Sequence, residues 1–311
     1  MILIENLVKT FDGFTALNKL NLCVDKGSIY GLVGVNGAGK TTIIKHVAGV
    51  YRQDAGSVQI DGMPVYENIA VKERIGYIPD DLYFFPGYSI GGLCSFCGGL
   101  YKKWDQNRFQ EMINLFGLNK RSKLGKLSKG MQKQAAFAVA MSKTPDVLLL
   151  DEPIDGLDPI ARRHVLKYIM EDAAARGLTV LISSHNLKEL EGVCDTVGIV
   201  KNGSMAVERN LDDLKSEILK VQLAFAPDGR AGGSNPDRHS GLQVLHRQKQ
   251  GGVEVLVIRG QASEIEDKIR NMHPLLYDIL PLSLEEIFIY GANEGADSGF
   301  QADPGAGGQK L

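Results

Sequence analysis

The sequence lacks the features that mark membrane-spanning and secreted proteins. Its 311 residues contain no run that approaches the ~20 consecutive apolar residues needed to cross a bilayer. Residues 1–5 have no basic segment of the kind that opens a signal peptide. Four cysteines in a chain of this length are too few for a disulfide framework and fit a reducing compartment. These absences predict a cytoplasmic protein.

An excess of charge of one sign is also missing. The chain has 35 basic and 37 acidic residues, for a net charge of −2. Proteins that bind the nucleic-acid backbone usually carry a strongly basic face, so no nucleic-acid partner is expected. The hydrophobic content of 44% is that of a globular protein. Because 311 residues exceed what one compact core usually uses, we expect a domain of about 200 residues and a smaller one.

The most informative segment that is present is glycine-rich, GVNGAGKTT at residues 34–42. It fits the pattern G-x-x-x-x-G-K-[ST], with a strand-like run before it and a helix-like run after it. Glycines let successive backbone N–H groups point into one concavity at the start of a helix, where phosphates need many donors. Lys40 would reach the β- and γ-phosphates, and the Thr41 hydroxyl would ligate Mg²⁺. The residues expected to bind the nucleotide here are Gly34, Asn36, Gly37, Ala38, Gly39, Lys40, Thr41 and Thr42. An ordinary strand-to-helix turn is the alternative.

Strand-like and helix-like segments alternate over most of the chain, and a hairpin is expected to turn at Asn202-Gly203. The expected strands are 2–8, 17–24, 56–62, 75–79, 147–150 and 178–182, and the expected helices are 160–175 and one from about 187. The alternation predicts a parallel central sheet with helices on both faces. It is interrupted at about 85–143, where apolar residues recur at helical spacing and indicate an inserted helical subdomain.

The composition changes at about residues 226–241, which have no apolar periodicity and are predicted to form a loop or linker. Around it, residues 221–290 combine alternating valines with apolar positions at helical spacing, which predicts a small α+β domain. Residues 291–311 are rich in Gly, Ala and Asp, and we expect them to be disordered.

Cys94 and Cys97 form a C-x-x-C sequence, for which a metal or redox site is one interpretation. The other cysteines, Cys23 and Cys194, lie far away in the sequence, and no second pair completes a four-ligand site. Packing of both thiols on one helix face at i, i+3 is therefore the favoured interpretation.

Two carboxylates, Asp151 and Glu152, follow the continuous apolar run at 147–150. Such a run is typical of a parallel strand buried on both faces, and residues after its carboxyl end lie in the ligand crevice of an open α/β sheet. One acid can hold Mg²⁺ and its neighbour can polarise an attacking water. A simple strand-ending turn is the alternative, which the phosphate loop elsewhere in the chain disfavours.

In their order and separation these motifs resemble those of the ATP-binding cassette (ABC) ATPases, over residues 1 to about 220. The similar segments are GVNGAGKTT (Walker A), LSKGM at 127–131 (signature), VLLLDEP at 147–153 (Walker B), GLDP at 156–159 (D-loop) and His185 (switch histidine). The resemblance implies an α/β fold with a P-loop NTPase core of ABC ATPase type, an N-terminal antiparallel β-subdomain and the inserted helical subdomain. The α+β domain at 221–290 would be a carboxyl-terminal appendage.

The resemblance also implies roles for single residues. Glu152 would be the general base, which must lie within hydrogen-bond reach of the lytic water. Asp151 would support Mg²⁺, and His185 would contact the γ-phosphate, with a purely structural histidine as the alternative. Phe11 falls where the family has an aromatic residue that stacks on adenine, although a lone Phe before a turn is otherwise usually core.

The signature segment implies a second subunit. Ser128 and Gly130 begin a helix, and in the family this helix start meets the ATP bound to the opposite subunit of a head-to-tail dimer. Asp158 of the D-loop is counted with the nucleotide-binding residues. The chain has one copy of each motif, so we expect a dimer with an identical chain or a paralogue.

Two residues depart from the family pattern. Lys129 stands where many relatives have Gly, and we interpret it as a feature of a bacterial subgroup with LSKGM. Asp80 stands where the family usually has the Q-loop glutamine. Aspartate still offers an oxygen to Mg²⁺ or its waters, so Asp80 is counted with the catalytic and metal-binding residues.

The task implied by the resemblance is transport. The aromatic segment 82–88 would suit a groove for a helix of a membrane partner, with filling of the subdomain's own core as the alternative. Residues 284–289 look like the ending of bacterial ABC ATPase subunits whose membrane halves are separate chains, often exporters. We therefore expect an ATPase that binds ATP and Mg²⁺, sits on the inner face of the cell membrane and works with a separate transmembrane permease.

Two alternatives remain open. A soluble ABC ATPase acting on ribosomes or DNA would usually carry two cassettes or long coiled coils, which this sequence does not show. A P-loop kinase of small molecules would leave LSKGM and His185 unexplained.

Overall fold

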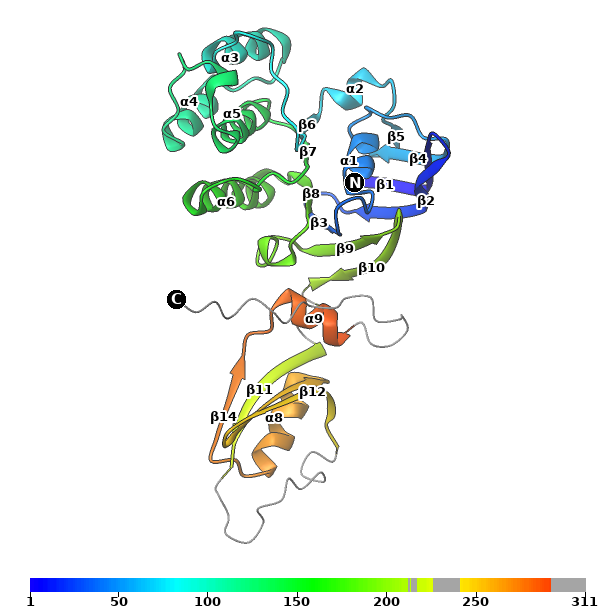
Figure 1. Ribbon diagram of the computed structural model, residues 1–311, viewed down its shortest axis with the longest axis vertical. Helices are drawn as coiled ribbons and strands as arrows, with labels where there is room; N and C mark the ends of the chain where they lie inside the picture. The colour runs from blue at the N-terminus through cyan, green and yellow to red at the C-terminus, as the bar shows by residue number, and fades with distance from the viewer. Residues whose placement is uncertain (212, 214–216, 226–240, 292–311) are drawn as a thin grey trace, which may run out of the picture. The chain divides into compact units, whose positions relative to one another are not determined.

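The computed structural model describes residues 1–211, 213, 217–225 and 241–291. The chain divides into two compact units, Met1–Asn210 and Leu211–Leu311, and each has its own sheet or sheets. Figure 1 labels their elements. Among the described residues, no helix combines the length and the apolar character needed to span a bilayer.

A six-stranded sheet forms the centre of the first unit. Its strands are β3 (Ile29–Val33), β6 (Ile75–Ile78), β7 (Val147–Leu150), β8 (Thr179–Ser184), β9 (Thr196–Lys201) and β10 (Ser204–Asn210). The order is β10-β9-β3-β8-β7-β6, and all neighbours are parallel except the β9–β10 hairpin. β3, β7 and β8 are buried along their whole length, as the continuous apolar run of β7 predicts for that strand.

A second, antiparallel sheet of the first unit has the order β2-β1-β4-β5. Its strands are β1 (Ile2–Phe11), β2 (Phe14–Val24), β4 (Ala55–Ile60) and β5 (Met63–Pro64). Helix α1 (Lys40–Val47) packs its buried Ile43, Ile44 and Val47 into one core formed by residues of both sheets. This core holds the start of α1, and with it the glycine-rich loop, rigidly in place.

The inserted helical subdomain is confirmed between β6 and β7. Its helices are α3 (Ile90–Leu100), α4 (Gln106–Leu115) and α5 (Lys129–Ser142), with a 3₁₀ turn η1 (Leu124–Lys126) before α5. Figure 1 shows α3, α4 and α5 grouped together, beyond the ends of β6 and β7. Two further helices of this unit are α2 (Ile69–Lys72) and α6 (Pro159–Arg176).

Cys94 and Cys97 lie on α3, and both side chains are buried, as packing at i, i+3 predicts. Burial raises the pKa of both thiols, that of Cys97 to about 11. A thiol that stays protonated at neutral pH is a poor nucleophile and a poor metal ligand. The structure therefore supports the packing interpretation.

The second unit has a four-stranded antiparallel sheet of order β12-β13-β11-β14. Its elements are β11 (Ile218–Ala224), β12 (Gln243–Gln250), β13 (Val253–Arg259), α8 (Ala262–Asn271), β14 (Leu276–Leu280) and α9 (Leu284–Gly291). Ile265 and Ile269 of α8 pack on Val221, Leu223 and Leu256 of the sheet. This is the predicted α+β appendage.

The helix predicted from about 187 is wrong, because this fully described stretch holds only a 3₁₀ turn, η2 (Leu187–Glu189). The Asp195 side chain accepts a hydrogen bond from the backbone N–H of Ile29 at 2.7 Å and so draws the chain into β9. The first unit ends at Asn210, earlier than the boundary at 220, because β11 pairs with β13 and β14. The expected linker, apart from residue 241, and the expected disordered tail, apart from residue 291, lie outside the described residues.

Candidate functional site

The glycine-rich loop runs closely against the sheet before α1 begins. Gly39 is the N-cap of α1 with a φ of 113°, and Gly37 has a φ of 81°. Both values fall in the left-handed region that glycine enters without strain. A Cβ on Gly34 would lie 2.5 Å from the carbonyl oxygen of Val200 in β9, so a side chain has no room there. The glycines thus give the loop the curled path that a phosphate-binding loop needs.

The other residues predicted to bind the phosphates lie around this path. Ala38 is buried, and its N–H donates to the carbonyl oxygen of Val35 at 3.1 Å, while Asn36 is exposed. Thr41 is exposed at the start of α1, and the carbonyl oxygen of Thr42 faces Nδ1 of His46 at 2.7 Å.

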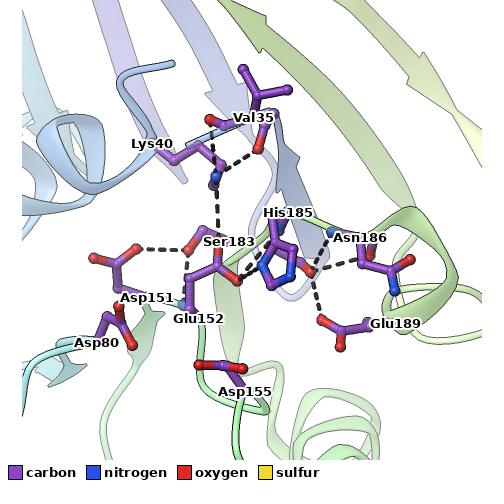
Figure 2. A network of polar contacts seen from close by, with 12 residues as sticks. Val35, Lys40, Asp80, Asp151, Glu152, Asp155, Ser183, His185, Asn186 and Glu189 are labelled. Carbon is purple, nitrogen blue, oxygen red and sulfur yellow. Dashed lines mark hydrogen bonds and ion pairs between the residues drawn. The ribbon is translucent and has the colours of Figure 1, made fainter. Parts of the chain in front are cut away.

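Lys40 is buried and turned back onto its own loop. Its Nζ donates to the carbonyl oxygen of Gly34 at 2.6 Å and lies 3.3 Å from Oε1 of Glu152. Oε2 of Glu152 in turn lies 2.9 Å from Nδ1 of His185. Figure 2 shows these contacts running from the loop, across the residues after β7, to the segment that follows β8. The structure therefore brings together Lys40, Glu152 and His185, three of the predicted site residues.

Asp151 is buried beside them and has one unused oxygen. Its Oδ1 accepts from the hydroxyl of Ser183 at 2.7 Å, whereas its Oδ2 is buried without a hydrogen-bond partner in the described part of the chain. Burial raises the pKa of this carboxyl, and the side chains of Ser183 and Thr41 oppose the rise. A buried, unpaired carboxylate oxygen next to a threonine hydroxyl is a donor set that suits a hard cation such as Mg²⁺. The residues present thus fit the predicted metal.

Glu152 is held at its backbone as well as at its side chain. Its φ of 47° lies in the left-handed region, which costs a non-glycine residue about 1–3 kcal/mol and is found most often at functional sites. Its N–H donates to the Ser183 hydroxyl at 2.9 Å, and its carbonyl oxygen accepts from Nζ of Lys133 at 2.6 Å. These two bonds compensate the unusual conformation.

Asp80 lies next to Asp151 in Figure 2 but faces two lysines of α5. Its Oδ1 is 3.1 Å from Nζ of Lys133 and 3.6 Å from Nζ of Lys129. Lys129 also lies 3.5 Å from Oδ2 of Asp155. In this conformation the Asp80 carboxylate is neutralised by cations of the helical subdomain.

The signature and D-loop residues act as helix caps in the single chain. The Ser128 hydroxyl accepts from the N–H of Met131 at 3.3 Å at the start of α5, and Asp158 accepts from two backbone N–H groups at the start of α6. A Cβ on Gly130 would lie 2.7 Å from the carbonyl oxygen of Gly156. No hydrogen bond or ion pair found among the described residues joins Ser128 or Asp158 to Lys40 or Glu152. These residues are not part of the site that their own chain forms.

Phe11 is not a core residue. Its side chain is partly exposed at the end of β1, packs edge to face on Tyr51 at 5.4 Å between ring centroids and lies under Nζ of Lys9 at 5.2 Å. An aromatic ring with an open face can stack on a base.

Ser183, Lys133 and Tyr51 contact the predicted residues, yet the sequence did not single them out. Ser183 precedes His185 in the run LISSH, so a polar residue ending a buried strand was its one signal. Lys133 looks like an ordinary surface lysine of an amphipathic helix. Its burial follows from tertiary packing, which no local pattern of the sequence records.

A phosphate loop at the start of a helix, beside a carboxylate pair at the end of a buried parallel strand, defines a P-loop nucleoside triphosphatase. The family described as ABC transporter matches residues 17–155. The chain is 32% identical over 290 residues to the ABC transporter ATP-binding protein YtrB of Bacillus subtilis, which covers 93% of this chain and 97% of YtrB. The chain therefore belongs to the ABC transporter ATP-binding proteins, and it is an ATPase of this class.

Further comparisons agree. The bacitracin transport ATP-binding protein BcrA of Enterococcus faecalis is 34% identical over 233 residues, which cover 73% of this chain and 74% of BcrA. The solved structure of an ATP binding subunit of an ABC transporter aligns with a TM-score of 0.63 and 26% identity over 69% of this chain and 92% of that one. The cassette cbiO1 of Clostridium perfringens, part of the complex cbiONQ, aligns with a TM-score of 0.58 and 26% identity over 70% and 90% of the two chains.

Proposed function

We propose that this chain is the ATP-binding and ATP-hydrolysing subunit of a bacterial exporter. It would act at the inner face of the cell membrane, as a head-to-tail dimer with an identical chain or a paralogue, and with a separate permease subunit. The observation that carries the proposal is the contact chain Lys40–Glu152–His185, which lies next to the unpaired oxygen of Asp151 and beside the phosphate loop.

The first step of the proposed mechanism is a change of partner at Lys40. In the structure, its ammonium group neutralises Glu152 and donates a hydrogen bond to the carbonyl oxygen of Gly34. The phosphates of ATP carry more negative charge than one carboxylate, so Lys40 would turn to them when ATP binds. Oε1 of Glu152, which has no hydrogen-bond partner among the described residues, would then be free to accept a proton from water.

Thr41 and Asp151 would hold Mg²⁺, which when bound supplies positive charge that neutralises the phosphate oxygens. Asp80 would reach such an ion only after leaving its lysine partners. Asp151 itself is oriented by Ser183, so its free oxygen keeps a fixed position.

Glu152 would act as the general base, and His185 would orient it and contact the γ-phosphate. Both the backbone N–H and Nδ1 of His185 approach Oε2 of Glu152, at 3.3 and 2.9 Å. This leaves Nε2 of the half-exposed ring to reach the substrate. The carboxylate would take the proton while the water oxygen forms its bond to phosphorus and ADP leaves.

Two observations support a dimer. Among the described residues, no hydrogen bond or ion pair joins Ser128 or Asp158 to Lys40 or Glu152, although the family resemblance counts them with the ATP site. Two large apolar side chains, Val35 in the phosphate loop and Ile160 after the D-loop, are 65% and 69% exposed.

The exposed aromatic side chains after β6 support a membrane partner. Tyr83 is 85% and Phe85 is 59% exposed, and Phe85 clusters with Tyr88 and Phe96 at centroid distances of 5.5 and 6.4 Å. Rings that fill the subdomain's own core would be buried, so this cluster is better explained as a docking surface. The export direction rests on the likeness of α9 to the ending of exporter subunits.

Affinity purification of the tagged full chain from detergent-solubilised membranes tests the task. We expect a polytopic membrane protein to co-purify with the wild type and to be lost from Tyr83→Ser/Phe85→Ser. The matched control Phe14→Ser changes an aromatic side chain that is 69% exposed on β2 and should keep the partner. Recovery of ribosomes or nucleic acid without a membrane protein would instead support a soluble ABC ATPase.

A further inference from the structure

Lys133 is a buried lysine at the junction of three segments. Its side chain is 1% exposed on α5, and its Nζ contacts Asp80, which follows β6, and the carbonyl oxygen of Glu152, which follows β7. Burial of an ammonium group is costly unless the charge is paired and its hydrogens are bonded. Here both conditions are met, by a carboxylate at 3.1 Å and a carbonyl oxygen at 2.6 Å.

The bond to Glu152 fixes a conformation that the chain would otherwise avoid. Glu152 has a φ of 47°, and the peptide groups on its two sides are held by different partners. Ser183 accepts from the N–H, and Lys133 donates to the carbonyl oxygen. Because the backbone orientation determines where the side chain points, loss of the Lys133 bond would move the Glu152 carboxylate relative to Lys40 and His185.

The bond to Asp80 makes the same lysine sensitive to the helical subdomain. Lys129 lies one helical turn before Lys133 on α5, and its Nζ is 3.6 Å from the same Asp80 oxygen. The nearby carboxylate of Asp80 is the largest cause of the raised pKa of Lys129. The two residues that depart from the family pattern, Asp80 and Lys129, are therefore partners in one charge cluster whose buried member is Lys133.

We propose that Lys133 is a positioning residue that links Asp80 and the helical subdomain to the backbone of Glu152. It does not touch the substrate. It sets the orientation of the catalytic carboxylate through the Glu152 carbonyl oxygen, and its ion pair with Asp80 makes that orientation respond to movement of α5. This inference rests on the proposed role of Glu152 as general base.

The chain offers a matched control on the same helix. Lys143 is also buried, at the carboxyl end of α5, and its Nζ donates to the carbonyl oxygens of Ile75 at 2.6 Å and of Lys72 at 3.1 Å. No hydrogen bond or ion pair among the described residues joins it to Asp80 or Glu152. Lys143→Met thus measures what the loss of a buried lysine and its carbonyl bonds does to the fold alone.

The test compares kcat and KM for MgATP, together with the melting temperature, in the full chain and its variants. Lys133→Met should lower kcat about tenfold or more with KM changed less than about threefold, because it displaces the base and leaves the phosphate loop intact. Lys143→Met should lower the melting temperature by about as much as Lys133→Met does, while its kcat changes less than about twofold. Where Lys133→Met does not fold, Lys133→Gln serves, since its side-chain amide keeps an uncharged donor group and should give an intermediate kcat.

Asp80→Asn should lower kcat less than Lys133→Met, and its effect should largely disappear in the Lys133→Met background. A folded Lys133→Met or Lys133→Gln variant with the wild-type kcat, or effects of Asp80 and Lys133 that simply multiply, would overturn the proposal. Glu152→Gln is measured in parallel. If Glu152→Gln abolishes hydrolysis and Lys133→Met does not slow it, the role of Lys133 is wrong and that of Glu152 stands. Normal turnover of Glu152→Gln would exclude both the role of Glu152 as base and the positioning role of Lys133.

Discussion

The Glu152 carboxylate meets a cation on one side and an imidazole on the other, at 3.3 Å from Lys40 and 2.9 Å from His185. Both carboxylate oxygens thus face a polar partner, and one partner must leave before a water molecule can approach. Binding of a polyphosphate supplies the stronger competitor for Lys40, so the same event that fills the site also activates the base. ATP binding and activation of Glu152 would thus be a single step.

Glu152→Gln tests the residue most directly. Glutamine has nearly the same shape but cannot accept the proton, so hydrolysis should fall at least about 100-fold while ATP binding is retained. Binding could be followed by fluorescent-nucleotide titration and turnover by phosphate release. Glu189→Gln is the control, because Glu189 bonds to Ser184 and Arg162 and not to Lys40. Equal turnover in the two variants would exclude Glu152 as the base.

At the scale of single residues, the sequence predicted the motif residues and missed the side chains that hold them in place. Lys40, Asp151 and Glu152 stand in patterns whose spacing carries the chemistry. Ser183 and Lys133 are distant in the sequence from the residues they hold, and their contacts depend on how β8 and α5 pack. Only the tertiary structure brings a serine of β8 to both Asp151 and Glu152.

Among the elements, the buried strands and capped helices follow from local physics. β7 is a continuous apolar run, and α6 begins with Asp158 as N-cap and Pro159 in its first turn and ends at Gly177 with a φ of 69°. The sequence therefore predicted both closely. It did not predict that the helix expected from about 187 would be only the short turn η2, since the hydrogen bond between Asp195 and Ile29 links residues far apart in the chain.

The caps of α6 and α4 give a matched pair of variants. Asp158 and Asp105 each accept hydrogen bonds from two backbone N–H groups, so replacement by Ala should lower the free energy of unfolding by about 1 kcal/mol in either case. Asp158→Ala should in addition lower kcat, because the D-loop is expected to face nucleotide in the dimer. Denaturant unfolding and ATPase assays measure both effects. Equal kcat in the two variants would limit Asp158 to a capping role.

The proposed dimer has two nucleotide sites, and the first unit of each chain would contribute half of each site. Its phosphate loop and carboxylates form one cluster, whereas Ser128 lies outside that cluster and caps α5. Two chains arranged head to tail would place the start of α5 from one subunit against the phosphates held by the other. The sequence resemblance predicted this arrangement.

Mixing inactive variants tests the arrangement. In a random equimolar mixture of Lys40→Ala and Ser128→Ala, half of the dimers contain one chain of each variant. Each of these mixed dimers has one site with both residues intact. The activity of the mixture should therefore rise to at most about a quarter of that of the wild type. Ser89→Ala removes the equivalent cap of α3 and should remain active alone. An absence of recovery at every mixing ratio would speak against shared sites.

The central claim is that ATP joins two of these chains, and the molar mass of Glu152→Gln in solution tests it most directly. Light scattering should give a mass near 33.9 kDa without nucleotide and about twice that value with MgATP. Ser128→Ala/Glu152→Gln should dimerise less readily. A mass that stays at 33.9 kDa while ATP is demonstrably bound would contradict the account.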